Sequence, residues 1–168
     1  MTRCVVDTNV PIVANGRPDP EDPRPPSVGC RRAAVSFLMD VVTNGTILLD
    51  TDGAVQAEYR RHLHPRGQPG VGDRFYQVVL HSAPLLVERV ELPRNPDGEY
   101  MHLPRPLVDV GFDPSDRKFA AIAHKEQVPV VNATDSDWVE HGPTLAAVGV
   151  GVHHLCGNDR DQWFVGEP

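Results

Sequence analysis

The sequence predicts an α/β protein in which helices cover both faces of a central, mostly parallel β-sheet, a three-layer α/β/α arrangement. Short apolar segments of strand length recur along the chain, and stretches with apolar residues at helical spacing separate them. Strands that are apolar throughout are typical of a parallel sheet buried on both faces. The length of 168 residues suits one domain, so we expect a single domain over residues 1–168.

The first half of the chain contains two predicted strands and two predicted helices. The strands are short apolar runs, the first helix has apolar residues at helical spacing before the turn signal TNG, and HPRGQPG breaks the second helix. In order, they are a strand over 3–7, a helix over 29–42, a strand over 46–49, and a helix that runs from N-caps at 50–52 to about 63. Thr8 to Pro11 directly follow the first strand and open the next segment.

The second half continues the alternation of helices and strands. In order, the predicted elements are a helix over 72–82, a strand over 85–92, a helix over 114–127, a strand over 128–133, a helix over 136–148 and a strand over 149–155. The third of these has a clear start, with Asp113 as N-cap, Pro114 at the first helical position and Asp116 at the third.

Two stretches do not fit this alternation. Residues 15–27, NGRPDPEDPRPPS, contain five prolines, which exclude a helix and a central strand, so we expect a stiff loop inserted at about 15–28. The stretch 94–111 is irregular and is the second apparent insertion. Inserted loops are positions where substrate access can differ between related proteins.

Composition and charge exclude several classes of protein. The net charge of −7 argues against a nucleic-acid binder that uses a broad basic surface, but not against an acidic active site. No apolar run approaches the length of a membrane span, and Asp7 interrupts the apolar core that a signal peptide would need. Cys4, Cys30 and Cys156 are widely spaced, which indicates neither a disulfide framework nor a zinc site. We therefore expect a cytoplasmic protein.

Four acids occupy positions that favour a shared site. Asp7 directly follows the first strand and Asp135 follows the strand over 128–133, so both should face the crevice at the carboxyl ends of the sheet. Glu58 borders the apolar stripe of its helix, and Asp116 lies at the head of a buried face. The alternative interpretations are turn or cap positions for the three Asp, and a surface pairing of Glu58 with Arg61 or His62.

A cluster of these four acids would require cations. Two carboxylates about 5 Å apart repel by about 3 kcal/mol at an effective dielectric constant near 20. Oxygen ligands that leave positions to water and phosphate suit Mg²⁺ or Mn²⁺, and two such ions can activate water and stabilise the leaving oxygen of a phosphodiester. The pattern predicts a metal-dependent nuclease.

The sequence resembles the PIN-domain family of nucleases. The resemblance lies in CVVDTNV at residues 4–10, the helical Glu58, and DRKFAAIAHKEQVPVVNATDSDW at 116–138, in that order along the chain. No motif can be matched between residues 61 and 107. The resemblance implies an α/β/α fold, a Mg²⁺ or Mn²⁺ site in an acidic pocket, and the activity of an endoribonuclease. RNA is the expected substrate, and DNA stays open as an alternative substrate. It also implies a protein partner that inhibits or activates the enzyme, and homo-oligomers.

The resemblance assigns roles by position. Asp7, Glu58, Asp116 and Asp135 are similar to the four family acids, and Asp137 to an auxiliary metal ligand. Asn9, beside Thr8, would order the loop after the first strand by hydrogen bonds, and Trp138 would anchor the closing segment in the core. The two insertions distinguish this chain from the short toxin-like members of the family.

Two other functions are weighed against the nuclease. A binding module with the same fold could lack turnover or await an activating partner. A receiver-type phospho-acceptor domain needs an acid pair at the first strand and a Lys after the last, and neither is present.

Adjacent basic residues, including Arg60–Arg61 and Arg117–Lys118, fit either contacts with phosphates or solvated helix faces. The histidines of HLH and VHH are expected to be exposed.

Overall fold

Five parallel strands form the centre of the molecule in the computed structural model, which describes residues 2–18, 20, 22–81 and 84–166. The strands are β1 (Arg3–Val6), β2 (Thr46–Asp50), β3 (Val87–Val90), β4 (Val130–Asn132) and β5 (Val152–His154). Their order across the sheet is β3-β2-β1-β4-β5, and every neighbouring pair is parallel. The predicted parallel sheet is confirmed, and β1 is its central strand.

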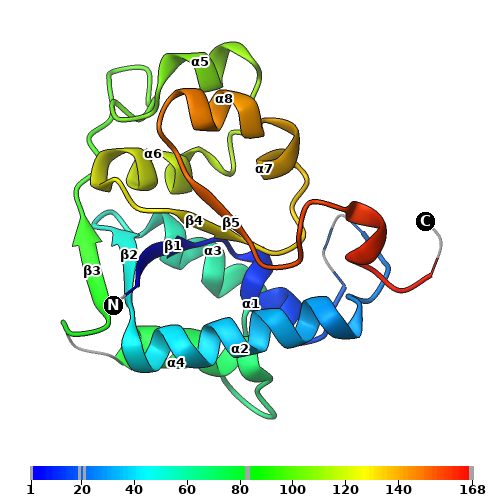
Figure 1. The fold of residues 1–168 in the computed structure, drawn as a ribbon. Helices are drawn as coiled ribbons and strands as arrows, with labels where there is room; N and C mark the ends of the chain where they lie inside the picture. Colours follow the sequence, from blue (N-terminus) through cyan, green and yellow to red (C-terminus); the bar gives the residue numbers. More distant parts are fainter. Residues whose placement is uncertain (1, 19, 21, 82–83, 167–168) are drawn as a thin grey trace.

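Helices cover both faces of this sheet. They are α1 (Asn9–Ala14), α2 (Val28–Asn44), α3 (Ala54–His62), α4 (Val71–His81), α5 (Arg105–Asp109), α6 (Arg117–Glu126), α7 (Asp137–Glu140) and α8 (Gly142–Ala147). Figure 1 shows α2 and α4 on one side of the sheet and α5 to α8 on the other, which makes the predicted three-layer α/β/α arrangement. Ser82, the last residue of the helix predicted over 72–82, lies outside the described residues.

The register of the sheet places two strand ends next to each other. Val5 pairs with Val130 and Val6 with Val131, so β1 and β4 end side by side. Both strands are buried apart from Arg3, and the chain leaves each of them on the same edge of the sheet. Side chains that follow β1 and β4 therefore meet at this edge.

The structure corrects the predicted start of the helix over 114–127. α6 begins at Arg117, and Asp116 is its N-cap residue. The Asp113 carboxylate accepts hydrogen bonds from the N–H and the hydroxyl of Ser115, both at 2.7 Å, so it closes a turn before the helix. Local turn formation by Asp competed here with the capping role that the sequence pattern suggested.

Two further expectations need correction along the second half of the chain. The stretch 94–111 contains the short helix α5 in addition to irregular segments. The helix predicted over 136–148 is two short helices, α7 and α8, with His141 at the junction. Pro143 in the first turn of α8 lacks the N–H that a continuous helix would need, which explains the break.

The largest correction concerns the cysteines and the C-terminal segment, residues 157–166. Cys30 and Cys156 form a disulfide, whereas Cys4 is buried as a free thiol. The expectation that no cysteines pair was wrong, because a separation of 126 residues carries no spacing signal in the sequence. Beyond this bridge, the C-terminal segment runs beside the proline-rich loop (Figure 1), and Pro26 and Phe164 form an isolated antiparallel bridge.

No helix in the described part of the chain is long and apolar enough to cross a bilayer.

Candidate metal centre

Asp7 is the first acid of the site and lies directly after β1. Its side chain is buried, with 3% of its surface exposed. One carboxylate oxygen accepts the N–H of Asn9 at 3.2 Å, and the other accepts the indole N–H of Trp138 at 2.5 Å. These two contacts orient the carboxylate between the loop after β1 and the first turn of α7.

Asn9 ties the loop after β1 to the end of β4. Its side-chain N–H donates to Asn132 at 3.0 Å, and its side-chain oxygen accepts the backbone N–H groups of Ala133 and Thr134 at 2.7 and 3.2 Å. An amide can serve as donor and acceptor at once, which a carboxylate cannot do. The two segments that carry Asp7 and Asp135 are thus held in a defined relation to each other.

Asp116 differs from an ordinary capping acid. It occupies the N-cap position of α6, is buried, and makes no side-chain capping hydrogen bond. Asp50, which is also buried, shows what a cap does: its two oxygens accept the N–H groups of Ala54 and Val55 at 2.8 and 2.9 Å. The capping explanation therefore holds for Asp50 and does not hold for Asp116.

Asp135 and Asp137 follow β4. Asp135 is half-buried, and one of its oxygens accepts the N–H of Asp137 at 2.9 Å. The Asp137 carboxylate accepts the backbone N–H of Asp113 at 3.1 Å, and so supports the turn that precedes α6. Of this pair, Asp135 belongs to the convergent acids, while Asp137 lines the same pocket.

Three of the four candidate acids converge. Asp7, Asp116 and Asp135 each offer a carboxylate oxygen, and these oxygens all lie within 4.8 Å of one another. They line a pocket of about 410 Å³ at the carboxyl ends of the strands. Each comes from a different segment, so the fold and not local sequence proximity produces the cluster.

The electrostatics of the cluster are unfavourable without a cation. Burial raises the pKa of Asp7 well above its usual range, and the carboxylates of Asp135 and Glu58 raise it further. Burial, followed by Asp7 and Asp135, also raises the pKa of Asp116. Asp73 behaves differently. Burial acts to raise the pKa of its carboxyl, but N–H donors and the charge of Arg17 outweigh burial, so that the pKa of Asp73 is lowered.

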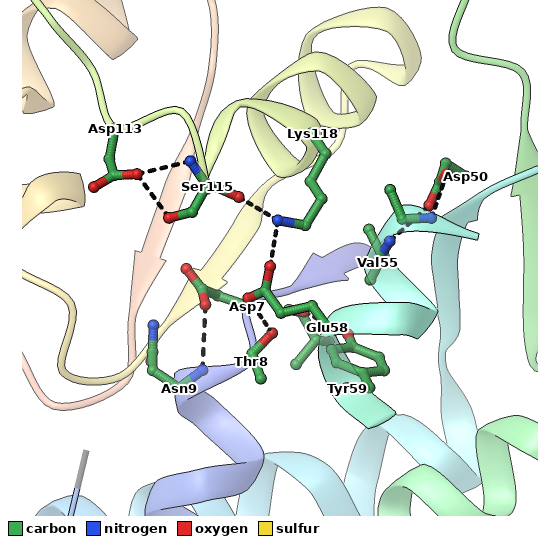
Figure 2. A network of polar contacts seen from close by, with 12 residues as sticks. Asp7, Thr8, Asn9, Asp50, Val55, Glu58, Tyr59, Asp113, Ser115 and Lys118 are labelled. Carbon is green, nitrogen blue, oxygen red and sulfur yellow. Dashed lines mark hydrogen bonds and ion pairs between the residues drawn. The ribbon is translucent and has the colours of Figure 1, made fainter. Parts of the chain in front are cut away.

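Glu58, the fourth candidate acid, lies in the pocket but is paired with a lysine. Figure 2 shows its carboxylate between Thr8 and Lys118. One oxygen accepts the Thr8 hydroxyl at 2.7 Å, and the other forms an ion pair with the Lys118 ammonium. Tyr59 donates its hydroxyl to the Val6 carbonyl at 2.5 Å and so fixes this part of α3 against β1. The alternative pairing of Glu58 with Arg61 or His62 was wrong.

The rim of the pocket includes residues to which the sequence analysis assigned no role. Pro20 and Asp22 of the proline-rich loop line it, together with Arg160, Trp163 and Phe164 of the C-terminal segment. Ser27 N–H donates to the Trp163 carbonyl at 2.8 Å, and the Arg24 guanidinium lies 4.6 Å from the centre of the Phe164 ring. No motif marks this segment in the sequence.

Lys118 is the other residue that sequence reasoning missed as part of the site. In the sequence, Lys118 and Arg117 form a basic pair that fits either contacts with phosphate or a solvated face. It is 7% exposed and its ammonium contacts the Ser115 carbonyl as well as Glu58. A signal was present, because Lys118 lies three and four positions before the apolar Ala121 and Ile122, which are buried on α6.

The donor set fits Mg²⁺ or Mn²⁺. Hard divalent cations of this kind prefer carboxylate oxygens, and three carboxylates leave coordination positions for water and phosphate. Asp7, Asp116 and Asp135 would hold such an ion, whose charge would offset the repulsion that raises the pKa values of Asp7 and Asp116.

The comparisons with known proteins identify a similar fold. No protein-family model matches this chain, and no curated protein sequence does. A chain in the crystal structure of VapBC2 from Rickettsia felis bound to a DNA fragment from their promoter is similar to it, with a TM-score of 0.51 and 13% sequence identity. The match covers 91% of this chain and 98% of that chain. At this identity the likeness shows the fold alone, a three-layer α/β/α arrangement.

Proposed function

We propose that this protein is a metal-dependent nuclease that hydrolyses phosphodiester bonds, with RNA as its substrate. The observation that carries the proposal is the convergence of Asp7, Asp116 and Asp135, whose carboxylate oxygens lie within 4.8 Å of one another. Clusters of carboxylates at the end of a parallel sheet suit phosphoryl transfer, because bound divalent ions neutralise phosphate charge. The similarity in fold to a chain of VapBC2 supports the same class.

The proposed reaction adds water across one ester bond. The water oxygen forms a bond to phosphorus, the bond from phosphorus to one ester oxygen breaks, the water gives up a proton and the departing oxygen gains one. A bound Mg²⁺ or Mn²⁺ supplies charge stabilisation and makes water easier to deprotonate. Asp7 is oriented for this task by Trp138, and Asp116 faces the pocket free of any capping bond.

Other residues of the pocket have supporting roles in the proposal. Asn9 and Thr8 order the segment that carries Asp7, and Asp137 orders the turn before α6. Glu58 completes the acidic side of the pocket. The structure with the similar fold contains VapBC2 bound to a DNA fragment from their promoter, which supports the proposal that a protein partner inhibits or activates this chain.

A cleavage assay tests the proposed function. The full chain is incubated with end-labelled single-stranded RNA, structured RNA and single-stranded DNA, each in Mn²⁺, Mg²⁺ or excess chelator. We expect cutting of RNA that requires the metal and is lost in Asp7→Asn. The matched control is Asp109→Asn, because Asp109 is exposed and pairs with Arg105 on α5.

The assay has two informative negative results. Cutting in excess chelator, or cutting retained in Asp7→Asn, would contradict a metal-dependent site built on these acids. No cutting of any pool, combined with a Mn²⁺-dependent rise in melting temperature, would favour the binding module or an enzyme that awaits an activating partner.

A further inference from the structure

Lys118 is a buried cation in the pocket that the proposed function does not yet use. It projects from the first turn of α6, and 7% of its surface is exposed. Its ammonium group forms an ion pair with Glu58 and donates to the carbonyl of Ser115, as Figure 2 shows. Lysine is rarely buried unless its charge is paired, so its position here calls for a partner of opposite charge, and Glu58 is that partner.

The pairing divides the acids of the pocket into two groups. Glu58 has a fixed cation, and its second oxygen accepts the Thr8 hydroxyl. Among the described residues, no Lys or Arg forms an ion pair with Asp7 or Asp116. The fixed cation of the pocket is thus paired with Glu58, and its charge also acts to lower the pKa of Asp116 without forming an ion pair with it.

The position of Lys118 is fixed on several sides. Besides Glu58 and Ser115, the ammonium lies 4.7 Å from the centre of the Phe119 ring. Both Glu58 and Lys118 line the pocket that Asp7, Asp116 and Asp135 line. An ammonium group has three N–H donors, and Glu58 and Ser115 account for two of them among the described residues.

We propose that Lys118 takes the place of a second divalent ion in this pocket. This inference rests on the proposed nuclease function. The three Asp then hold one Mg²⁺ or Mn²⁺, Glu58 holds Lys118, and the remaining N–H of Lys118 contacts an oxygen of the phosphate that is cleaved. A fixed ammonium group stabilises negative charge on phosphate as a point charge, which is how lysine commonly acts on this group.

The number of Mn²⁺ ions bound tests the inference without reference to activity. Chelator-treated full-length protein is titrated with Mn²⁺ in a calorimeter. We expect one ion per chain in the wild type. Lys118→Met is expected to bind two, because it removes the cation that pairs with Glu58, whose carboxylate lines the same pocket as Asp7. Lys118→Met combined with Glu58→Gln should return to one.

Lys125→Met is the matched control. Lys125 lies on the same helix and donates to the carbonyl of Glu91, away from the pocket, so this variant should bind one ion. Cleavage at saturating Mn²⁺ is expected to be about 100-fold slower than in the wild type for Lys118→Met combined with Glu58→Gln, which lacks both the ammonium group and a second ion. Lys125→Met should cut at the wild-type rate.

The outcomes separate this inference from the proposed function. Two ions bound by the wild type would overturn the proposed role of Lys118, but would remain consistent with a nuclease that uses two metal ions. This measurement does not depend on the folding of any variant. One ion in both the wild type and Lys118→Met, or an unchanged cleavage rate in Lys118→Met combined with Glu58→Gln, would also overturn it. No Mn²⁺ binding by the wild type would instead remove the metal centre on which the proposed function depends.

Discussion

Asp116→Asn is expected to lower the rate of cleavage by about 1,000-fold and, in the absence of divalent metal, to raise the melting temperature. The two effects have opposite signs because the same carboxylate is required for the metal and disfavours the metal-free fold. Near pH 8 we expect the metal-free variant to be about 2 kcal/mol more stable than the wild type, which corresponds to about 6 °C for a chain of this length.

The physical reason is the raised pKa of Asp116. Burial first, and then the carboxylates of Asp7 and Asp135, favour its protonated form in the folded chain. An acid with a raised pKa contributes stability below its unfolded value near 3.9, and that contribution is lost as the pH rises through the folded value. Asparagine carries no charge at any pH, and Asp116 makes no capping hydrogen bond that the change would remove.

Thermal unfolding at pH 4 to 8, with chelator or with Mn²⁺, measures this effect. The difference in melting temperature between the metal-free variant and the wild type should be near zero at pH 4 and grow toward pH 8. Mn²⁺ should stabilise the wild type and leave the variant unchanged. A metal-free variant that is less stable than the wild type at pH 8 would show that Asp116 does not face uncompensated carboxylates.

Reduction of the Cys30–Cys156 disulfide is expected to lower the free energy of unfolding by about 4 kcal/mol and the melting temperature by about 10 °C. The bridge joins residues separated by 126 positions, and cross-links that close long loops restrict the unfolded chain strongly. It also joins the start of α2 to the residue directly before the C-terminal segment, which contributes to the lining of the acid pocket.

Thermal unfolding with and without a thiol reductant tests this prediction. The double variant Cys30→Ser, Cys156→Ser should have the melting temperature of the reduced wild type, and the reductant should not change it. Cys4→Ala, which leaves the bridge intact, should respond to the reductant like the wild type. Three reactive thiols in the denatured, unreduced protein would contradict the pairing. Because disulfides persist mainly in oxidising compartments, the same thiol count bears on the expected cytoplasmic location.

Much of the fold was predictable from local patterns. Apolar runs such as CVV and VPVV predict buried parallel strands, and the observed β1 and β4 overlap them. Asp7 and Asp135 could be expected to share a crevice, because parallel strands end at one edge of the sheet. The start of α6 was misjudged, since Asp113 and Ser115 close a local turn that resembles a helix cap in sequence.

The features that were missed depend on contacts between distant parts of the chain. Lys118 turns inward because Glu58, 60 positions away, supplies its counter-charge. The C-terminal segment reaches the pocket because it pairs with the proline-rich loop and follows the disulfide. Neither a basic pair nor an isolated cysteine specifies its partner, so these contacts cannot be read from periodicity or spacing.

The sequence by itself determined the layers of the fold and the acids that gather at one sheet edge, because both follow from the periodicity of apolar residues and from where strands end. Only the tertiary structure decided how the charges in the pocket divide. It brings the carboxylates of Asp7, Asp116 and Asp135 together, and Asp116 makes no capping hydrogen bond. It also pairs the carboxylate of Glu58 with the ammonium of Lys118. The reason is physical: the state of a buried charge depends on the groups around it, and here other segments of the chain supply them.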